Sequence, residues 1–267
     1  MRSSHQARAA AAAQDMLSKL GICAPHHIDV ELIAAHHDIC LHYRPMTQQD
    51  GHLLRAKRSL IVIDERARRS HKWRFVVAHE LGHYVLHAAH DQLLACTDAD
   101  ARRGYATSPL EQEANAFASE LLMPTSMFGP MCDAFGAEVM PTMEHLSTLA
   151  QTFGTSLTAT ALRFSALTRS ASAIVYAQSG RIAWVRASPA FELPLRAHVQ
   201  LQRGSYARAL RDGQRLPREP LPVEASAWSR SARARRCPLL FEDSIHMKEY
   251  DATLTLLWHE RDRQVRA

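Results

Sequence analysis

The stretch FVVAHELGHYVLH, residues 75–87, decides how the rest of the chain is interpreted. It sets His79, Glu80 and His83 in the pattern HExxH, inside a run of apolar and small residues that predicts a helix. Each helical residue advances about 100° and 1.5 Å, so the two histidines lie on one face about 6 Å apart. Two imidazoles in that arrangement can bind one metal ion, whereas burying them with a glutamate and no ligand would be costly.

The residues between the two histidines support this interpretation. Glu80 is too close in sequence to His79 to complete a tetrahedral site, but it can reach a water molecule beside the metal, so its expected role is general base. Gly82 costs ~1 kcal/mol of helix propensity relative to alanine. Close packing against a neighbouring helix would explain its presence.

A catalytic zinc site needs a third protein ligand and an open position for water. The pattern HExxHxxGxxH would require glycine at position 86 and histidine at 89, but these are Leu86 and Ala89, so that class is excluded. His87 lies one turn beyond His83, and three ligands spread along about 12 Å of one helix cannot share an ion. We therefore expect His87 to pack beside the site or to support a ligand.

A second predicted helix, LEQEANAFASELL at residues 110–122, offers three glutamates. Periodicity places Glu111 on the apolar, inward face, whereas Glu113 and Glu120 share the opposite face, expected to be wet. Glu111 is therefore the expected third ligand, and Asn115, four residues later, is placed to support it by a hydrogen bond. The alternative is that Glu111 only pairs with a surface arginine.

These two segments together resemble the ImmA/IrrE family of metallopeptidases. The resemblance rests on AHELGHYVLH and on EQEANAFASELLMP about twenty residues later, and it covers about residues 28 to 165. It implies a minimal zincin-like fold and a zinc-dependent endopeptidase, with His79, His83 and Glu111 as metal ligands and Glu80 as base. It also implies a substrate, a helix-turn-helix transcriptional repressor whose cleavage switches on stress, DNA-damage or mobile-element genes.

The pattern along the chain predicts an α+β protein in three parts. Residues 1–135 form a zincin-like helical core with a small three-stranded sheet, whose strands are ICLHYRP, GHLLRAK and SLIVID. Two helices, Ala7–Leu20 and IDVELIAAHH, come first, the second with Ile28, Leu32 and Ile33 on one apolar face. Residues 136–170 form helix-turn-helix-like helices, and 171–267 a β-rich domain that is a candidate sensor.

The helix-turn-helix-like segment raises an alternative function, a DNA-binding transcriptional regulator with a structural or vestigial metal site. Between residues 144 and 164 the segment carries Arg163 and little other positive charge, which makes a poor reader of phosphates or bases. The basic run WSRSARARR, residues 228–236, is the better candidate for nucleic-acid contact, although such runs are usually solvated loops.

Composition narrows the class of protein. The chain has 267 residues, 46% of them hydrophobic, and a net charge of +5. Its five cysteines are odd in number and never form a CxxC pair, which fits neither a disulfide framework nor a zinc ribbon. No run of eighteen apolar residues and no signal-peptide core are present, so we expect a cytoplasmic protein without a membrane partner.

Overall fold

The computed structural model describes residues 4–47, 50–69, 72–88, 95–96, 108–134, 140–231, 234 and 239–259. It divides the chain into two compact units, Met1–Phe128 with Ala150–Ala159, and Gly129–Leu149 with Thr160–Ala267. Both contain helices and β-sheet, which confirms the α+β class. The domain limits expected at 135 and 170 stay predictions.

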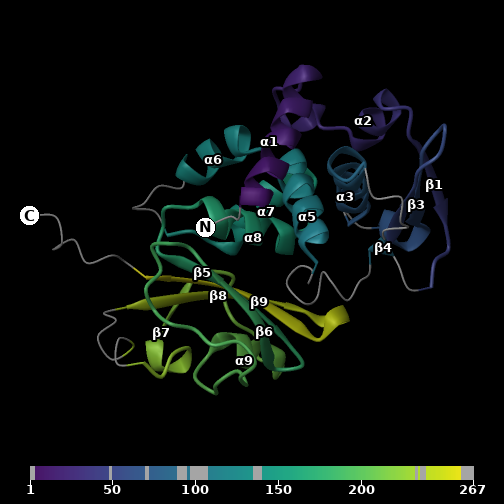
Figure 1. Ribbon diagram of the computed structural model, residues 1–267. Coiled ribbons are helices and arrows are strands. Elements are labelled where there is room, and N and C mark those ends of the chain that lie inside the picture. Colours follow the sequence, from purple (N-terminus) through teal and green to yellow (C-terminus); the bar gives the residue numbers. More distant parts are fainter. Residues whose placement is uncertain are drawn as a thin grey trace, which may run out of the picture. The chain divides into compact units, whose positions relative to one another are not determined.

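Three long helices form the core of the first unit (Figure 1). Helix α5 (Pro109–Leu122) lies between α1 (Ser4–Lys19) and α3 (Lys72–Leu86) and packs against both. Ser108 caps the start of α5 and is followed by proline at the first helical position, where no backbone N–H is needed. The HExxH segment lies in α3 and is buried from Val76 to His83, as its apolar composition predicts.

A four-stranded sheet lies against α3. Its order is β1-β3-β2-β4, with β1 (Cys40–Arg44) parallel to β3 (Leu60–Asp64) and β2 (Gly51–Leu54) antiparallel to β3. The three predicted strands are confirmed, and a two-residue strand, β4 (Ala95–Cys96), is added beside β2.

Helix α2 (Val30–His36) begins after Asp29, whose carboxylate accepts hydrogen bonds from the N–H groups of the first turn. The predicted apolar face of this helix is partly wrong, because Leu32 is 69% exposed. The helix starts after Ile28, so its buried face is built from Val30, Ile33 and Ala34, and Leu32 points away from it.

The predicted helix-turn-helix-like segment forms α7 (Met143–Phe153) and α8 (Leu157–Leu167), preceded by α6 (Thr125–Ala134). Gly154 joins α7 to α8 with a φ of 59°, a left-handed conformation that glycine adopts without strain. Arg74 of α3 donates to the carbonyls of Phe153 at 2.6 Å and Gly154 at 2.9 Å. The turn is thus held against α3 by a half-buried guanidinium.

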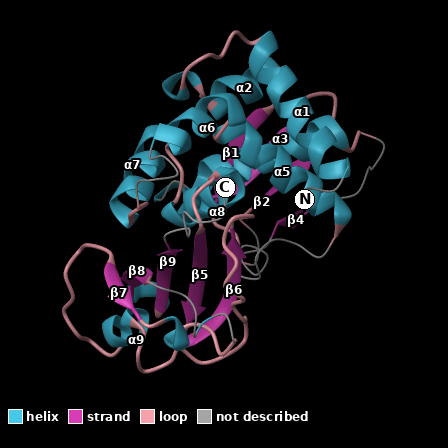
Figure 2. Cartoon of the chain, turned by 90° about the vertical axis from the view of Figure 1, so that its left-hand side faces the viewer, coloured by secondary structure: helices cyan, strands magenta, loops and turns pink. Residues whose placement is uncertain are grey.

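The second unit is built on a five-stranded antiparallel sheet of order β6-β5-β9-β8-β7 (Figure 2). A short helix, α9 (Tyr206–Arg211), packs on β8 and β9. The strands are β5 (Ser172–Gln178), β6 (Arg181–Ala187), β7 (Leu221–Val223), β8 (Leu240–Met247) and β9 (Ala252–His259). This arrangement confirms the β-rich C-terminal region.

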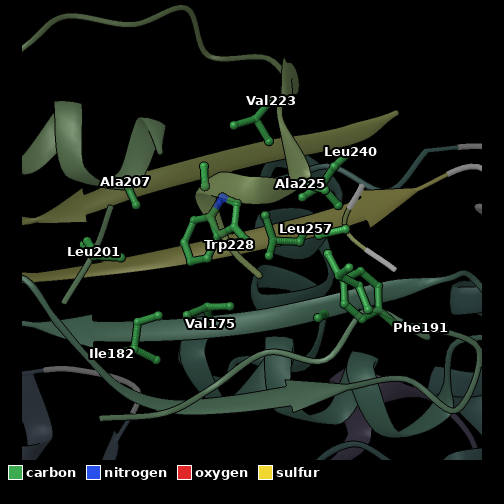
Figure 3. Packing of buried hydrophobic residues seen from close by; sticks show 14 of the residues in the cluster. Val175, Ile182, Phe191, Leu201, Ala207, Val223, Ala225, Trp228, Leu240 and Leu257 are labelled. Atoms are coloured by element: carbon green, nitrogen blue, oxygen red, sulfur yellow. The ribbon is translucent and has the colours of Figure 1, made fainter. Parts of the chain in front are cut away.

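One face of this sheet holds a core centred on Trp228, which lies among Val175, Leu257 and Ala225 (Figure 3). Short 3-10 turns connect the elements, at Pro25–His27, Glu65–Arg69, Ala225–Ala227 and Lys248–Tyr250. The basic run at 228–236 lies partly outside the described residues. None of the described helices has the length and hydropathy needed to cross a membrane.

Candidate metal centre

The two histidines of α3 face one another at the centre of the first unit. The Nε2 atoms of His79 and His83 are 2.9 Å apart, and the side chains are 2% and 0% exposed. One helical turn separates the residues, which places both rings on the face of α3 that meets α5.

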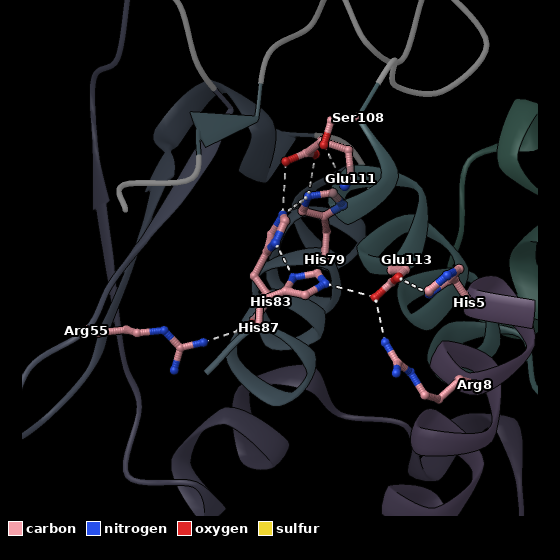
Figure 4. A network of polar contacts seen from close by, with 9 residues as sticks. All are labelled: His5, Arg8, Arg55, His79, His83, His87, Ser108, Glu111 and Glu113. Carbon is pink, nitrogen blue, oxygen red and sulfur yellow. Dashed lines mark hydrogen bonds and ion pairs between the residues drawn. The ribbon is translucent and has the colours of Figure 1, made fainter. Parts of the chain in front are cut away.

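Glu111 completes the group from the first turn of α5 (Figure 4). Its Oε2 lies 3.1 Å from Nε2 of His79, and its Oε1 lies 3.2 Å from Nε2 of His83. The ligand-type atoms of these three residues all lie within 4.8 Å of one another. The structure therefore brings together the three residues predicted as metal ligands.

Close approach of α3 and α5 makes this geometry possible. A Cβ atom at Gly82 would lie 3.1 Å from Cα and 3.2 Å from the carbonyl oxygen of Ala114. Both contacts are to backbone atoms, which cannot move aside without separating the helices. The glycine whose helix propensity is poor is thus the residue that lets the two ligand-bearing helices meet.

Glu80 is completely buried, on the side of α3 that faces the sheet. A Cβ atom at Gly51 of β2 would lie 3.8 Å from Oε1 of Glu80 and would overlap Val76, so only glycine lets the strand pass this close. The negative charge of Glu80 is one of the influences that raise the pKa of His79. The carboxylate therefore acts electrostatically on the predicted site.

A hydrogen bond lies behind each ring, between His87 and His83 as expected, and between Asn115 and His79, although Asn115 was expected to support Glu111. Asn115 Oδ1 lies 3.0 Å from Nδ1 of His79, so it supports this histidine. Asn115 lies one helical turn after Glu111 on α5. Its amide oxygen meets Nδ1 of His79, whereas Glu111 meets Nε2 on the other side of the same ring. His87 supports the other ring, with its Nδ1 at 3.0 Å from Nδ1 of His83.

The prediction that Glu113 and Glu120 share a wet face is wrong. They are 4% and 0% exposed, because α1 covers this side of α5. Glu120 accepts hydrogen bonds from Gln14 of α1 and from Thr125, at 2.8 Å and 3.0 Å. Glu113 contacts His87. The periodicity of α5 correctly placed Glu113 and Glu120 on one face. It could not show that α1, about a hundred residues earlier in the sequence, covers that face.

Burial and mutual contacts shift the pKa values of Glu111, His79 and His83 in different directions. Burial acts to raise the pKa of Glu111, but hydrogen bonds with His79 and His83 outweigh it and lower that pKa far below its usual value. Burial opposes the charged form of His79, yet Glu111 and Glu80 raise its pKa, whereas burial lowers the pKa of His83. The carboxylate is thus held as an anion among imidazoles.

Sequence reasoning missed Arg55. Its Nη2 donates to the carbonyls of His83 at 2.7 Å and Tyr84 at 3.0 Å, in the last turn of α3, where the His83 carbonyl also accepts from the N–H of His87. The guanidinium also lies over the Tyr84 ring, 5.2 Å from its centroid. No local pattern around Arg55 indicates this contact, which depends on the pairing of β2 with the sheet.

Two comparisons with known proteins give matches, one over residues 34–165 and one over most of the chain. Residues 34–165 match the peptidase family M78, described as the IrrE N-terminal-like domain. A Mycobacterium tuberculosis transcriptional regulator has a similar fold, with a TM-score of 0.58 and 14% identity over 94% of this chain and 76% of that chain. The comparison with curated proteins gives no match.

Proposed function

Because residues 34–165 make this chain a member of the IrrE N-terminal-like peptidase family, we propose that it is a zinc-dependent endopeptidase. The observation that carries the proposal is the convergence of His79, His83 and Glu111, buried or nearly so, with ligand atoms within 4.8 Å. Two imidazoles and a carboxylate are a donor set that fits Zn²⁺ and leaves a coordination position free for water.

The residues of the site have separate roles in the proposed reaction: metal binding, proton transfer and orientation of a ligand. His79, His83 and Glu111 would hold the ion, which when bound would polarise the peptide carbonyl and lower the pKa of a water molecule. Glu80 takes the proton from the attacking water and passes it to the leaving amine. Asn115 keeps the ring of His79 oriented through its Nδ1.

The proposed substrate is a helix-turn-helix transcriptional repressor in the cytoplasm, by resemblance to the ImmA/IrrE family. Cleavage of such a repressor would release stress, DNA-damage or mobile-element genes. The β-rich second unit is the proposed sensor that receives the activating signal. Its separate sheet and core give it the independence that a sensing module needs.

The test uses the purified full chain and, as candidate substrates, short helix-turn-helix proteins encoded next to it. We expect about one zinc per chain and cleavage of one candidate. Glu80→Gln keeps the zinc and lowers the cleavage rate by about 10²–10⁴-fold, because only proton transfer is removed. Cleavage at the wild-type rate by Glu80→Gln would overturn the assignment of the base, and a chain without zinc would overturn the proposal.

The DNA-binding alternative has less support. Arg163, the basic residue noted in this poorly charged segment, is 3% exposed and therefore inaccessible to phosphates. Arg74 of α3 also holds the turn between the two helices. A salt-dependent gel shift with double-stranded DNA that persists in Glu80→Gln would favour the alternative, whereas no shift at low salt would count against it.

A further inference from the structure

A chain of hydrogen bonds leads from His83 away from the metal centre (Figure 4). Nδ1 of His83 is 3.0 Å from Nδ1 of His87, and Nε2 of His87 is 3.1 Å from Oε2 of Glu113. Oε1 of Glu113 then lies 3.1 Å from Nδ1 of His5, at the start of α1. Three helices are thus connected through one series of side chains.

The chemistry of imidazole gives this chain a direction. A histidine that binds a metal through Nε2 carries its proton on Nδ1. That proton can only be donated, so His87 must accept it with an unprotonated Nδ1. A neutral His87 then carries its own proton on Nε2, which faces the Glu113 carboxylate. Each donor therefore meets an acceptor, with a single consistent set of tautomers.

Burial makes Glu113 a strong acceptor. His87 and Glu113 are each 4% exposed, and a buried carboxylate is costly unless it is hydrogen-bonded or paired with a charge. Arg8 of α1 supplies that charge from 3.5 Å, at the edge of the buried region. The ionised state of Glu113 is thus supported from α1 on one side while it accepts from His87 on the other.

The two ligand histidines are supported differently. His79 meets a neutral amide oxygen on Asn115, whereas His83 is connected through His87 to a full negative charge. Carboxylate support makes an imidazole a more basic ligand and fixes its orientation. His83 therefore gains an anionic support that sequence spacing alone would not assign.

We propose that His87 and Glu113 form a positioning relay that holds His83 in its metal-binding tautomer, with α1 anchoring the far end. The proposal rests on the metal site of the proposed function. His87 and Glu113 contact neither the ion nor the substrate. Their effect is expected in metal affinity and in the proton positions of the two histidines.

Metal affinity is the first measurement, made on the full chain by competition with a chromogenic zinc chelator. Glu113→Ala removes the acceptor and is expected to weaken zinc binding by about 10–100-fold, the range for such supporting residues. Glu113→Gln keeps an acceptor for the Nε2 proton of His87 and is expected to recover most of this loss. An unchanged zinc affinity in Glu113→Ala overturns the relay.

Glu120→Ala is the matched control. Glu120 is also a buried glutamate of α5 that contacts α1, through Gln14 at 2.8 Å, and it lies about 10 Å of helix axis beyond Glu113. We expect it to lower the thermal midpoint about as much as Glu113→Ala and to leave zinc affinity unchanged. Equal loss of affinity in both variants would mean that general loosening of α1, and not the relay, weakens the site.

The second measurement reads the tautomers directly, by two-bond ¹⁵N–¹H correlation spectra of the zinc-loaded protein. We expect the proton of His83 on Nδ1 and that of His87 on Nε2. A proton on Nδ1 of His87 overturns the relay even if Glu113→Ala weakens zinc binding, because His87 could not then accept from His83.

These outcomes separate the relay from the proposed function. If zinc binds, the tautomers agree and no repressor is cleaved, the peptidase proposal fails while the relay stands. If cleavage occurs but zinc affinity is insensitive to Glu113, only the relay fails. If the wild-type chain binds no zinc, both fail.

Discussion

Glu111 in the first unit and Glu242 in the second are both carboxylates shielded from much of the solvent, and their neighbours shift their pKa values in opposite directions. In the first unit, imidazoles surround Glu111 and lower its pKa against the effect of burial. In the second unit, burial raises the pKa of Glu242, although four donors bind it. These are the indole N–H of Trp228, the hydroxyl of Ser244 and the backbone N–H groups of Tyr206 and Ala207.

The difference separates a binding site from a structural one. Glu111 is held by groups that could themselves bind a metal ion, and its side chain keeps 15% of its surface exposed. Glu242 is 1% exposed, and its partners are neutral donors from α9, β8 and the segment around Trp228. A cation could join the first cluster, whereas the second stabilises the fold by satisfying buried groups.

Removing each carboxylate and measuring bound zinc is expected to give the largest difference between Glu111 and Glu242. We expect Glu111→Ala to lose stoichiometric zinc and to lower proteolysis by at least about 10³-fold, because one ligand of three is gone. Glu242→Gln should bind zinc as the wild type does. Metal analysis after gel filtration decides this, and retained zinc in Glu111→Ala would remove Glu111 from the ligand set.

For the free energy of unfolding, we expect the larger effect at Glu242 and the smaller effect at Glu111. Glu242→Ala leaves the N–H groups of Trp228 and Ala207 buried without an acceptor, at about 1–3 kcal/mol for each unsatisfied group. Glu242→Gln keeps an amide oxygen and should cost less. Urea unfolding followed by tryptophan fluorescence measures both variants, and equal stability of Glu242→Ala and the wild type would contradict a structural role.

Helix approach in the first unit can be tested at Gly82. Gly82→Val places a branched side chain against the backbone of Ala114 and is expected to cost about 1–3 kcal/mol of unfolding free energy. It should also weaken zinc binding, because α3 and α5 must separate. Gly129→Val, at a glycine with nothing within 4 Å of its Cβ position, is the control for added bulk and should leave zinc affinity unchanged.

The smallest expected effect is a pH dependence in the second unit. The pKa of Glu242 is raised by burial, so between the unfolded pKa of about 4.3 and the higher folded pKa the native state binds more protons than the unfolded state. This group therefore lowers stability as pH rises through that window, by at most about 1.4 kcal/mol per pH unit. Urea midpoints of the wild type minus those of Glu242→Gln should fall with rising pH, and a rising difference would reverse the sign.

Local periodicity was sufficient for the residues at the centre of the site. The spacing of His79 and His83 puts both on one helical face, and the apolar pattern of the second helix points Glu111 inward. Those two facts, with Gly82 as the sign of a close helix pair, anticipated three residues that the structure places together. The fold class and the three main strands of the first sheet were predictable for the same reason, since alternation and apolar runs are local properties.

Contacts between distant segments were not predictable in this way. Whether the outer face of α5 meets water or α1 depends on packing between helices about a hundred residues apart, so Glu113 and Glu120 were misplaced. Arg55 reaches α3 only because β2 joins the sheet, and Glu242 meets Trp228 only because the second unit folds around it.

Helical periodicity in the amino-acid sequence was enough to show which side chains share a helix face, and it pointed to His79, His83 and Glu111. The packing of distant helices set which ligand each supporting residue contacts, Asn115 behind His79 and His87 behind His83, and it added Glu113 behind His87. The two kinds of information act over different distances along the sequence. Helical periodicity is set by backbone geometry within a few residues, whereas burial and hydrogen-bond partners are set by whichever distant segment packs against that face.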